Sequence, residues 1–366
     1  MTGSPFSSII VLTLACRPVY PAPGRYTGLF PTPQADKGKC LMMDLLLTVV
    51  LFALGIVLIV KGGDAFVDAA AWMAEVSGIP KLIVGATVVS FATTLPELLV
   101  SSMAAFEGKV DMAIGNAVGS VTANLALIMG IALVCLPSAI RRRDYLLKAV
   151  LMLGASLYLV LAASGGSLSF QSGIALLILF AIALWDNIRS ALRSMRAEQA
   201  AAGRGGHPRP MGREVSRNLL KFLLGAAGIV IGAQLLVDHG GNLARLIGVP
   251  ERIIGVTLIA VGTSLPELVT TLTAIAKKQA SLSAGNIIGA NIIDLTLILP
   301  ICSLISGGDL PVSPQALAID LPACLLVGCI AMVPSLVTGR FQRWQGGVLL
   351  LSYVVYLVIT CSGSVL

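Results

Sequence analysis

Residues 85–128 read GATVVSFATTLPELLVSSMAAFEGKVDMAIGNAVGSVTANLALI, and residues 255–298 read GVTLIAVGTSLPELVTTLTAIAKKQASLSAGNIIGANIIDLTLI. The two stretches align at one constant offset without a gap, and the alignment preserves a Pro-Glu pair (Pro96-Glu97 and Pro266-Glu267) and a Gly-Asn pair (Gly115-Asn116 and Gly285-Asn286). Chance similarity between two leucine-rich helices does not keep both pairs at one offset. The sequence therefore predicts two related halves.

The composition indicates a membrane protein. Hydrophobic residues make up 56% of the 366 residues and charged residues only 12%, and the mean hydropathy is +0.92. Soluble domains carry about 25% charged residues, so water cannot be the solvent for this much apolar surface. The apolar runs reach the ~20 residues that a spanning helix needs. They are too long for barrel strands, and helices satisfy their own backbone hydrogen bonds in lipid.

We predict an all-α membrane protein with ten transmembrane helices in two inverted five-helix repeats. The first repeat covers residues 42–188, the second covers 216–366, and the stretch 189–215 is a basic cytoplasmic linker. Because five is odd, the second repeat enters the membrane from the opposite side, and such transporters place their site at the repeat interface. The predicted spans are 44–71, 79–106, 111–137, 144–163, 168–188, 216–240, 249–276, 281–306, 315–336 and 344–362.

Residues 1–41 differ from the rest, because they are rich in proline and contain no apolar run of spanning length. We expect this tail to be disordered or to result from a start site upstream of the natural one at Met42 or Met43. Asp64 and Asp68, near the end of the first span, are expected to pair with Lys61 or to cap loops.

The short loops predict the orientation, because cytoplasmic loops carry an excess of Lys and Arg. The basic connections follow the third, fifth, seventh and ninth spans, at 141–143, 189–215, 277–278, Arg340 and Arg343. The loop after the eighth span contains Asp309 and neither Lys nor Arg. We therefore place the four basic connections in the cytoplasm and the N-terminus outside.

Two glutamates, Glu97 and Glu267, lie in the middle of apolar spans, where a charge costs at least about 2.5–3.5 kcal/mol on insertion scales. Each follows a proline, which has no N–H, so carbonyls one turn earlier lose their hydrogen-bond partner. Free carbonyls at membrane depth are tolerated where they line a cavity. Hydroxyl groups stand directly before both Leu-Pro-Glu turns, at Thr93, Thr94, Thr263 and Ser264.

The next span of each half adds Asn124 and Asp294, which follow the two glutamates at the same spacing, and Ser120 lies one turn before Asn124. We expect the two glutamates, Asn124 and Asp294 to converge on one cation. Calcium takes six to eight oxygen ligands with carboxylates among them, whereas soft metals prefer Cys or His, which these segments lack. The pattern therefore favours a calcium site.

Other functional classes find little support in the sequence. With two histidines and no CxxC pair among seven cysteines, an HExxH zinc site and a histidine-based triad are excluded. No nucleophile–base pair is present, so we predict no enzyme and no cofactor. The net charge of +7 is assigned to topology and to contact with anionic lipid, and nothing indicates nucleic acid.

These motifs resemble the paired alpha-repeats of the sodium/calcium exchanger family, within the calcium/cation antiporter superfamily. The family pattern is approximately A-x-G-T-S-x-P-E followed by G-N-x-x-G-S-N-x-x-N/D. This chain has SFATTLPE with GNAVGSVTAN in the first half and AVGTSLPE with GNIIGANIID in the second. The resemblance extends from about Met42 to the C-terminus, and a doubled motif of this length is specific.

The resemblance implies a role for each matching residue. Glu97 and Glu267 are the central ion ligands, Thr93 and Thr263 ligate the metal beside them, and Asn124 and Asp294 complete the site. Flanking sodium sites are implied at Thr94, Ser264, Ser120 and the backbone carbonyls of Ser90 and Ala260.

The chain departs from the family pattern at four positions, which are Ala92 for glycine, Thr94 for serine, Val121 for asparagine, and Ala290 where the first half has Ser120. The alanine at position 290 removes a hydroxyl from one flanking sodium site. This departure bears on the sodium stoichiometry and on the choice of driving ion.

The function implied is exchange of calcium for sodium by alternating access, with the first and sixth spans sliding as gates. We expect a monomer in the plasma (inner) membrane of a prokaryote. The alternatives are proton- or potassium-coupled exchange and, less favoured by an inverted repeat with broken helices, a passive cation channel. Proton exchangers resemble GN-x-x-E-L at the second motif, whereas this chain has Gly119 and Gly289 at the acidic position.

Overall fold

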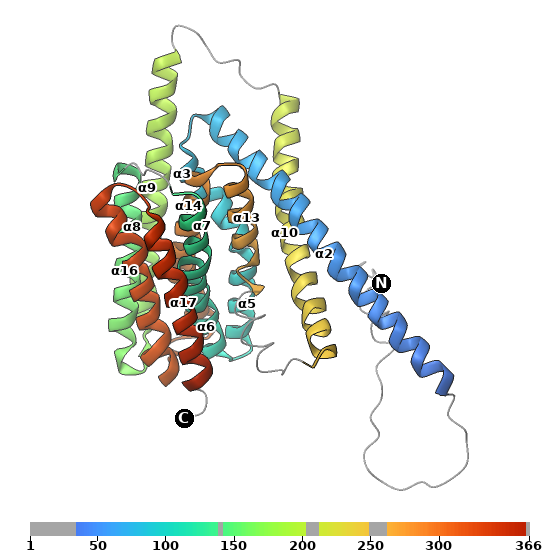
Figure 1. Cartoon of the computed structure of the whole chain (residues 1–366). Coiled ribbons are helices and arrows are strands. Elements are labelled where there is room, and N and C mark those ends of the chain that lie inside the picture. Colours follow the sequence, from blue (N-terminus) through green and yellow to red (C-terminus); the bar gives the residue numbers. More distant parts are fainter. Residues whose placement is uncertain (1–33, 138–141, 203–211, 249–261, 364–366) are drawn as a thin grey trace, which may run out of the picture. The chain divides into compact units, whose positions relative to one another are not determined.

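The computed structural model describes residues 34–137, 142–202, 212–248 and 262–363, in two units, Met1–Leu45 and Leu46–Leu366. The described part is helical except for one pair of two-residue strands (Figure 1). The first half contains α2 (Gln34–Ser77), α3 (Lys81–Val84), the π-helix η1 (Gly85–Val89), α4 (Ser90–Thr93), α5 (Leu95–Phe106), α6 (Val110–Ala123), the π-helix η2 (Asn124–Met129), α7 (Gly130–Cys135), α8 (Arg142–Ala162), the 3₁₀ turn η3 (Ala163–Gly165), β1 (Ser167–Leu168) and α9 (Phe170–Ala202). The second half contains α10 (Gly212–Leu246), α13 (Leu265–Ala276), α14 (Ala280–Ile293), the π-helix η5 (Asp294–Ile298), α15 (Leu299–Ile305), β2 (Leu310–Pro311), the π-helix η6 (Ala316–Asp320), α16 (Leu321–Thr338) and α17 (Arg343–Gly363).

Eight helices of the described part are long and apolar enough to cross a membrane. A further span is formed by a bent pair, Lys81–Thr93 and Leu95–Phe106, whose axes differ by 45°. The predicted seventh span lies partly outside the described residues, which include its second part as the shorter apolar helix α13. The protein is therefore a multi-pass, helical membrane protein, and the described part accounts for up to nine of the ten predicted spans.

Two helices extend beyond the predicted spans. Helix α9 continues to Ala202 and α10 begins at Gly212, so both enter the predicted linker. Helix α2 begins at Gln34, inside the predicted tail, whose residues 1–33 lie outside the described residues. Hydropathy marks the apolar part of a helix, and polar turns that continue it carry no such signal.

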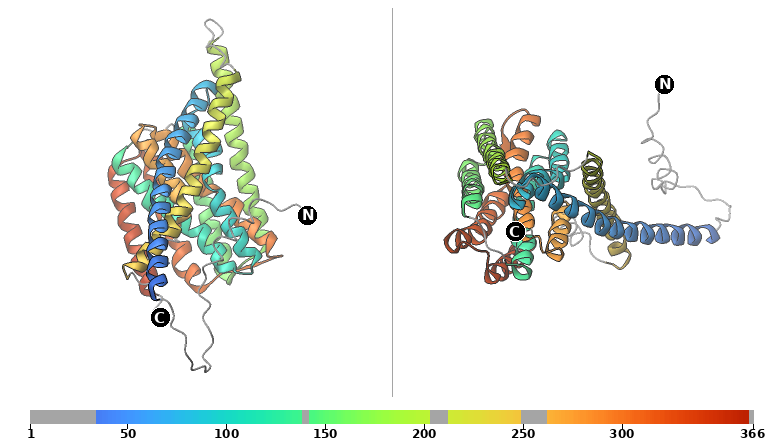
Figure 2. Two further views of the ribbon diagram at one scale, coloured as in Figure 1. Left: turned by 90° about the vertical axis from the view of Figure 1, so that its right-hand side faces the viewer. Right: turned by 90° about the horizontal axis from the view of Figure 1, so that it is seen from above.

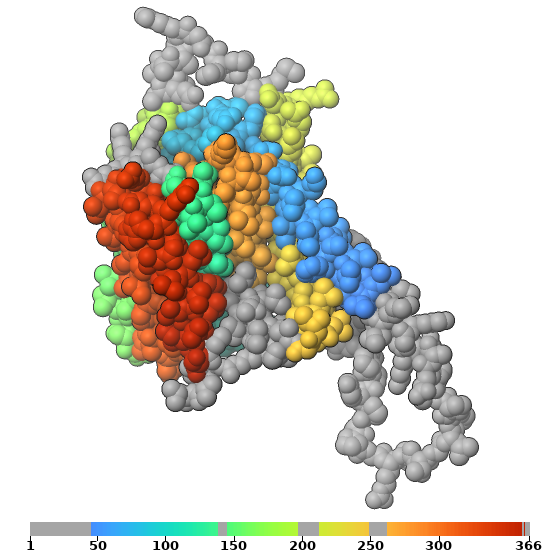
Figure 3. Space-filling view, viewed as in Figure 1, coloured from blue at the N-terminus to red at the C-terminus, as the bar shows by residue number. Residues whose placement is uncertain are grey.

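Large apolar side chains cover the surface of the outer helices. On α17, shown in red in Figure 3, Leu351, Val354 and Val358 are each more than half exposed. Contiguous apolar surface of this kind is rare on soluble monomers, and here it suits contact with lipid hydrocarbon. By contrast, every side chain of α14 from Leu282 to Ile293 is buried, so this helix lies in the centre of the unit.

Glycines allow α14 to approach the broken second span closely. A Cβ atom on Gly285 would lie 2.2 Å from the carbonyl oxygen of Leu82, and one on Gly85 would lie 2.3 Å from that of Leu282. On Gly289 it would lie 2.6 Å from the Cα of Ala86. Any side chain at these positions would separate the helices, so the glycines of the repeated motif fix the distance between the two segments that precede the candidate site.

Helices α2 and α10 cross through a second set of glycines (Figure 2). A Cβ on Gly55 would lie 3.0 Å from the Gly232 carbonyl oxygen, and one on Gly62 would lie 2.9 Å from the Gly225 carbonyl oxygen. Residue numbers rise along α2 as they fall along α10, so the two helices run antiparallel at this crossing. Small residues at such contacts let membrane helices pack backbone to backbone.

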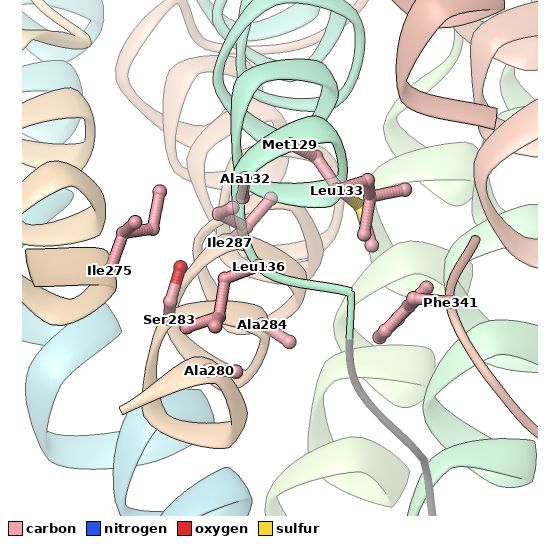
Figure 4. Close-up of a pocket in the computed structure, with 10 residues that line it drawn as sticks. All are labelled: Met129, Ala132, Leu133, Leu136, Ile275, Ala280, Ser283, Ala284, Ile287 and Phe341. Atoms are coloured by element: carbon pink, nitrogen blue, oxygen red, sulfur yellow. The ribbon is translucent and has the colours of Figure 1, made fainter. Parts of the chain in front are cut away.

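Described residues beside three of the four basic connections lie at one end of the helices. Leu136 after α7, Ala280 at the start of α14 and Phe341 between α16 and α17 line one small cavity (Figure 4). Beside this end, Lys277 pairs with Asp68 at 2.7 Å and with Asp64 at 3.3 Å, so the partner of both aspartates comes from the loop after α13 rather than from Lys61.

The loops predicted to lie outside meet each other as well. Strand β1 pairs with β2 in antiparallel fashion, with Ser167 opposite Pro311 and Leu168 opposite Leu310. The Asp309 carboxylate accepts a hydrogen bond of 2.9 Å from the backbone N–H of Phe170. These contacts join the connection between α8 and α9 to the one between α15 and α16, as the predicted orientation requires.

Candidate functional site

The two Pro-Glu pairs begin new helices. Pro96 is the second residue of α5 and Pro266 is the second residue of α13, where a missing N–H leaves no helix hydrogen bond unmade. Glu97 and Glu267 therefore lie in the first helical turn, where the helix dipole favours negative charge. In the first half Thr94 separates α4 from α5, and the span bends by 45° at this point.

The described candidate residues are almost all buried. Those that are at most 2% exposed are Ser90, Thr93, Thr94, Glu97, Ser120, Asn124, Ser264, Glu267 and Asp294. Thr263 is half-buried, and Ala260 lies outside the described residues. Asn124 and Asp294 are the first residues of the π-helical turns η2 and η5, and π-helical turns inside α-helices occur frequently at functional sites.

Hydrogen bonds connect candidate residues of one half to residues of the other. The Thr94 hydroxyl donates to Oε1 of Glu267 at 3.4 Å, and the hydroxyls of Ser120 and Thr263 lie 3.4 Å apart. The Thr93 hydroxyl lies 3.1 Å from Oδ1 of Asn286. The structure thus brings the two halves together around the Leu-Pro-Glu turns.

Several buried polar atoms in this region have no hydrogen-bond partner among the described residues. They include both carboxylate oxygens of Glu97 and of Asp294, Oε2 of Glu267, the Ser264 hydroxyl, and both amide atoms of Asn124. The Glu97 carboxylate interacts electrostatically with those of Glu267 and Asp294. A buried anion without partners is strongly unfavourable, so either a proton or a bound cation must neutralise each of these acids.

The carboxylates alone do not form a metal-binding cluster. Within the described ranges, no group of three Asp, Glu, His or Cys side chains is arranged to hold one metal ion. A cation at this site would therefore need hydroxyl, amide or carbonyl oxygens in addition to the glutamates. The threonines and serines beside the Leu-Pro-Glu turns are such donors, and calcium accepts them.

Sequence reasoning missed the part that two asparagines play at this site. Asn116 and Asn286 each accept a hydrogen bond from a candidate threonine of the opposite half, Thr263 and Thr93. The signal was present, because the Gly-Asn pair recurs at the same offset as Pro-Glu. The Gly-Asn pair served only as evidence for the repeat, and its asparagines had no assigned role.

Comparison with known proteins agrees with these features. The family model described as sodium/calcium exchanger protein matches residues 47–188 and 218–362. The chain is 31% identical to the sodium/calcium exchanger MaX1 of Methanosarcina acetivorans, over 84% of this chain and 96% of that protein. It is 35% identical to the inner membrane protein YrbG of Escherichia coli, over 78% of this chain and 88% of that protein.

A solved structure of a sodium-calcium exchanger has a similar fold. The sodium-calcium exchanger NCX_Mj, soaked with Na⁺ and Sr²⁺, superposes with a TM-score of 0.72 at 27% identity, covering 86% of this chain and 99% of that one. The family match covers both halves of the chain and includes both Pro-Glu motifs. This chain therefore belongs to the sodium/calcium exchanger protein family, whose members are membrane antiporters and not enzymes.

Proposed function

We propose that this protein exchanges Ca²⁺ for Na⁺ by alternating access at one site shared by two inverted five-helix repeats. The observation that carries the proposal is the set of buried carboxylate oxygens on Glu97, Glu267 and Asp294 that have no hydrogen-bond partner among the described residues. They come from both halves, and a hydroxyl of the first half, that of Thr94, donates to Glu267 of the second. Charges of this kind persist inside a membrane protein where they bind ions.

The crossing of α2 and α10 supports the inverted repeat. Gly55 and Gly225 are equivalent at the offset that aligns the Pro-Glu motifs, as are Gly62 and Gly232. In the structure Gly55 meets Gly232 and Gly62 meets Gly225, so exchanging the repeats maps one contact onto the other. Equivalent helices that run antiparallel are what two repeats of opposite membrane orientation require. With the partly described span that includes α13, the proposal has ten spans.

In this proposal Glu97, Glu267, Thr93 and Thr263 ligate calcium, and Asn124 and Asp294 complete the centre of the site. Sodium ions bind at the same glutamates and at flanking positions formed by Thr94, Ser264, Ser120 and the carbonyls of Ser90 and Ala260. Calcium and sodium therefore compete for the same carboxylates.

The charge of the site supports obligatory exchange. Three buried carboxylates without a cation would carry uncompensated charge across the membrane, which is energetically prohibitive. Binding of one calcium or of several sodium ions removes most of this charge. The site therefore crosses only when loaded, which couples the two fluxes. The protein functions as a monomer in a prokaryotic plasma (inner) membrane, and it needs no cofactor.

The test is calcium uptake into vesicles that contain the purified protein. Sodium, potassium and proton gradients are imposed in turn, and calcium entry is followed with an enclosed indicator. We expect uptake only when sodium leaves the vesicle. Uptake driven by a potassium or proton gradient in the absence of sodium would contradict sodium coupling, and calcium flux that needs no counter-ion would indicate a channel.

Glutamine substitutions test the site itself. Glu97→Gln and Glu267→Gln each remove one ligand charge with little change in shape, and we expect either variant to abolish sodium-driven calcium uptake. Glu107→Gln is the matched control, because Glu107 lies just after α5, is half exposed and pairs with Lys109 at 2.6 Å. Wild-type rates in either central variant, at equal protein incorporation, would exclude the proposed site.

A further inference from the structure

We propose that Asn116 and Asn286 are positioning residues for the cation site. Each accepts the hydroxyl proton of a threonine from the opposite half and thereby turns that threonine's lone pairs toward the ion. This inference rests on the proposed function and deepens it, because it names residues that set calcium affinity through Thr93 and Thr263.

The two contacts are equivalent under exchange of the repeats. Oδ1 of Asn286 accepts from the Thr93 hydroxyl at 3.1 Å, a shorter contact than the 3.2 Å from that hydroxyl to the backbone carbonyl oxygen of Ser90. Oδ1 of Asn116 accepts from the Thr263 hydroxyl at 3.3 Å, and the Ser120 hydroxyl lies 3.4 Å from the Thr263 hydroxyl oxygen. Thr93 corresponds to Thr263 and Asn116 to Asn286 in the alignment of the two halves. Both contacts cross from one half to the other, so each half orients a candidate ligand that belongs to its partner.

The orientation of the Asn116 amide follows from its other contacts. Its Nδ2 group donates to the backbone carbonyl of Glu97 at 3.3 Å and to the hydroxyl of Ser101 at 2.9 Å. A carbonyl oxygen only accepts hydrogen bonds, so the end of the amide that faces Glu97 must be the NH₂ group. The oxygen of the amide therefore faces Thr263.

The orientation of Asn286 follows in a similar way. Its Nδ2 group lies 2.9 Å from the hydroxyl of Thr270. That hydroxyl has one proton, which it donates to the backbone carbonyls of Pro266 at 2.9 Å and Glu267 at 3.0 Å. Thr270 must therefore accept from Asn286, which leaves the amide oxygen to face Thr93. Asn286 is 1% exposed, so water does not compete for its oxygen.

The chemistry of a hydroxyl ligand explains why this matters. A threonine hydroxyl has one proton and two lone pairs, and it can ligate a cation only if the proton points elsewhere. An acceptor on the far side of the hydroxyl holds the proton in that position before the ion arrives. Partners that orient a ligand in this way typically change metal affinity by about 10- to 100-fold when removed.

The test is a pair of double-mutant cycles, with the calcium concentration for half-maximal uptake and the calorimetric affinity for Ca²⁺ as the two readouts. We expect Asn116→Ala to raise the half-maximal concentration and the dissociation constant about tenfold. In the Thr263→Val background the same change should add almost nothing, because the hydroxyl on which Asn116 acts is gone. In the Thr93→Val background, Asn116→Ala should still raise the calcium dissociation constant about tenfold, as it does in the wild-type background.

Equal, multiplicative effects of Asn116→Ala in both threonine backgrounds would overturn the inference, since a residue that only supports the fold does not distinguish Thr263 from Thr93. The mirrored cycle, Asn286→Ala with Thr93→Val and then with Thr263→Val, tests the same claim on other residues if one variant does not fold. Wild-type protein is measured in parallel. Absence of its sodium-driven uptake contradicts the proposed function, whereas normal uptake with multiplicative cycles contradicts this inference alone.

Discussion

The two halves place the same kind of turn at the site, but they differ in the hydrogen bonds and in the acidic residues around it. Thr94 donates a hydrogen bond to Glu267, whereas its counterpart Ser264 has no partner for its hydroxyl among the described residues, and neither has the Glu97 carboxylate. The second half also has Asp294 where the first has Asn124. The comparison teaches that the repeat supplies the geometry of the site, while individual substitutions distribute its charge and hydrogen bonds.

The largest expected effect comes from changing the distribution of charge. Asn124→Asp adds a fourth carboxylate to a site where the oxygens of Glu97 and Asp294 already lack partners among the described residues. An uncompensated buried charge costs about 3–5 kcal/mol. We therefore expect sodium-driven calcium uptake to fall at least about 100-fold at equal protein incorporation, measured in vesicles.

A compensating variant shows whether the added charge is what lowers calcium uptake in Asn124→Asp. Adding Asp294→Asn to the same chain moves the carboxylate from the second half to the first and returns the site to three acids. We expect this double variant to recover a large part of the uptake that Asn124→Asp removes. If the double variant is as inactive as the single one, the position of the acid matters and its charge does not.

A smaller effect is expected from restoring the missing hydroxyl. Ala290 is fully buried on α14, and its counterpart Ser120 lies 3.4 Å from the hydroxyl of Thr263. Ala290→Ser would supply the second half with an equivalent oxygen, and a hydrogen-bond-sized gain of about 1 kcal/mol corresponds to roughly fivefold. We expect the sodium concentration for half-maximal exchange to fall by about that factor, with the calcium value changed less than the sodium value.

Ala284→Ser is the control for this change, because Ala284 is a buried alanine of the same helix that lines the small cavity beside the basic loops. It should leave the dependence on sodium unchanged. An equal shift in both variants would mean that α14 responds to any added hydroxyl, and the comparison between Ser120 and Ala290 would then say nothing about sodium.

The smallest effect is expected at the helix ends, where the halves also differ. Lys277 bridges to Asp64 and Asp68 on α2, whereas the equivalents of Lys277 and Asp68 in the other half are Glu107 and Asp238, both acidic. Lys277→Met removes the bridge that connects α2 to the end of α13. Exposed ion pairs contribute about 1 kcal/mol or less. We therefore expect the ratio of the half-maximal calcium concentrations on the two membrane sides to change about two- to threefold.

The measurement compares half-maximal calcium concentrations on the two membrane sides in inside-out and right-side-out preparations. Without the bridge, the end predicted to be cytoplasmic should open more readily. The half-maximal calcium concentration on the cytoplasmic side should therefore fall relative to that on the external side. Lys278→Met removes a neighbouring charge and should leave the ratio unchanged. A shift in the opposite direction would show that the bridge does not hold that end closed.

The positions of the acids could be predicted because the signal is local and occurs twice. A glutamate after a proline in an apolar run is conspicuous in one segment, and the duplication repeats it at Glu267. The glycines that recur with these acids are small residues of the kind that permits close helix packing, which the structure shows at Gly285 and Gly289. Every described candidate ligand is buried or half-buried, beside the two turns or on the next span.

The partners of these residues could not be predicted, because they depend on how distant segments dock. Thr263 and Asn116 lie in different halves of the chain, and so do Lys277 and Asp64. A search along one helix therefore suggested Lys61 for Asp64 and left Asn116 without a role. The π-helical turns at Asn124 and Asp294 also have no hydropathy signal, since they change the backbone hydrogen bonding and not the apolar pattern.

The glycine crossing of α2 and α10 has a mechanical consequence. At Gly55, Gly62, Gly225 and Gly232 the backbones come within contact distance of the facing helix. Beside these contacts the ring of Phe66 on α2 stacks on that of Phe222 on α10, with 4.5 Å between the ring centroids. A displacement of either helix along its axis breaks no hydrogen bond within the helices, but it has to separate the stacked rings of Phe66 and Phe222. Because a Cβ on Gly62 would lie 2.9 Å from the Gly225 carbonyl oxygen, we expect a single methyl group added there to force the two helices apart and so to change how they move against each other.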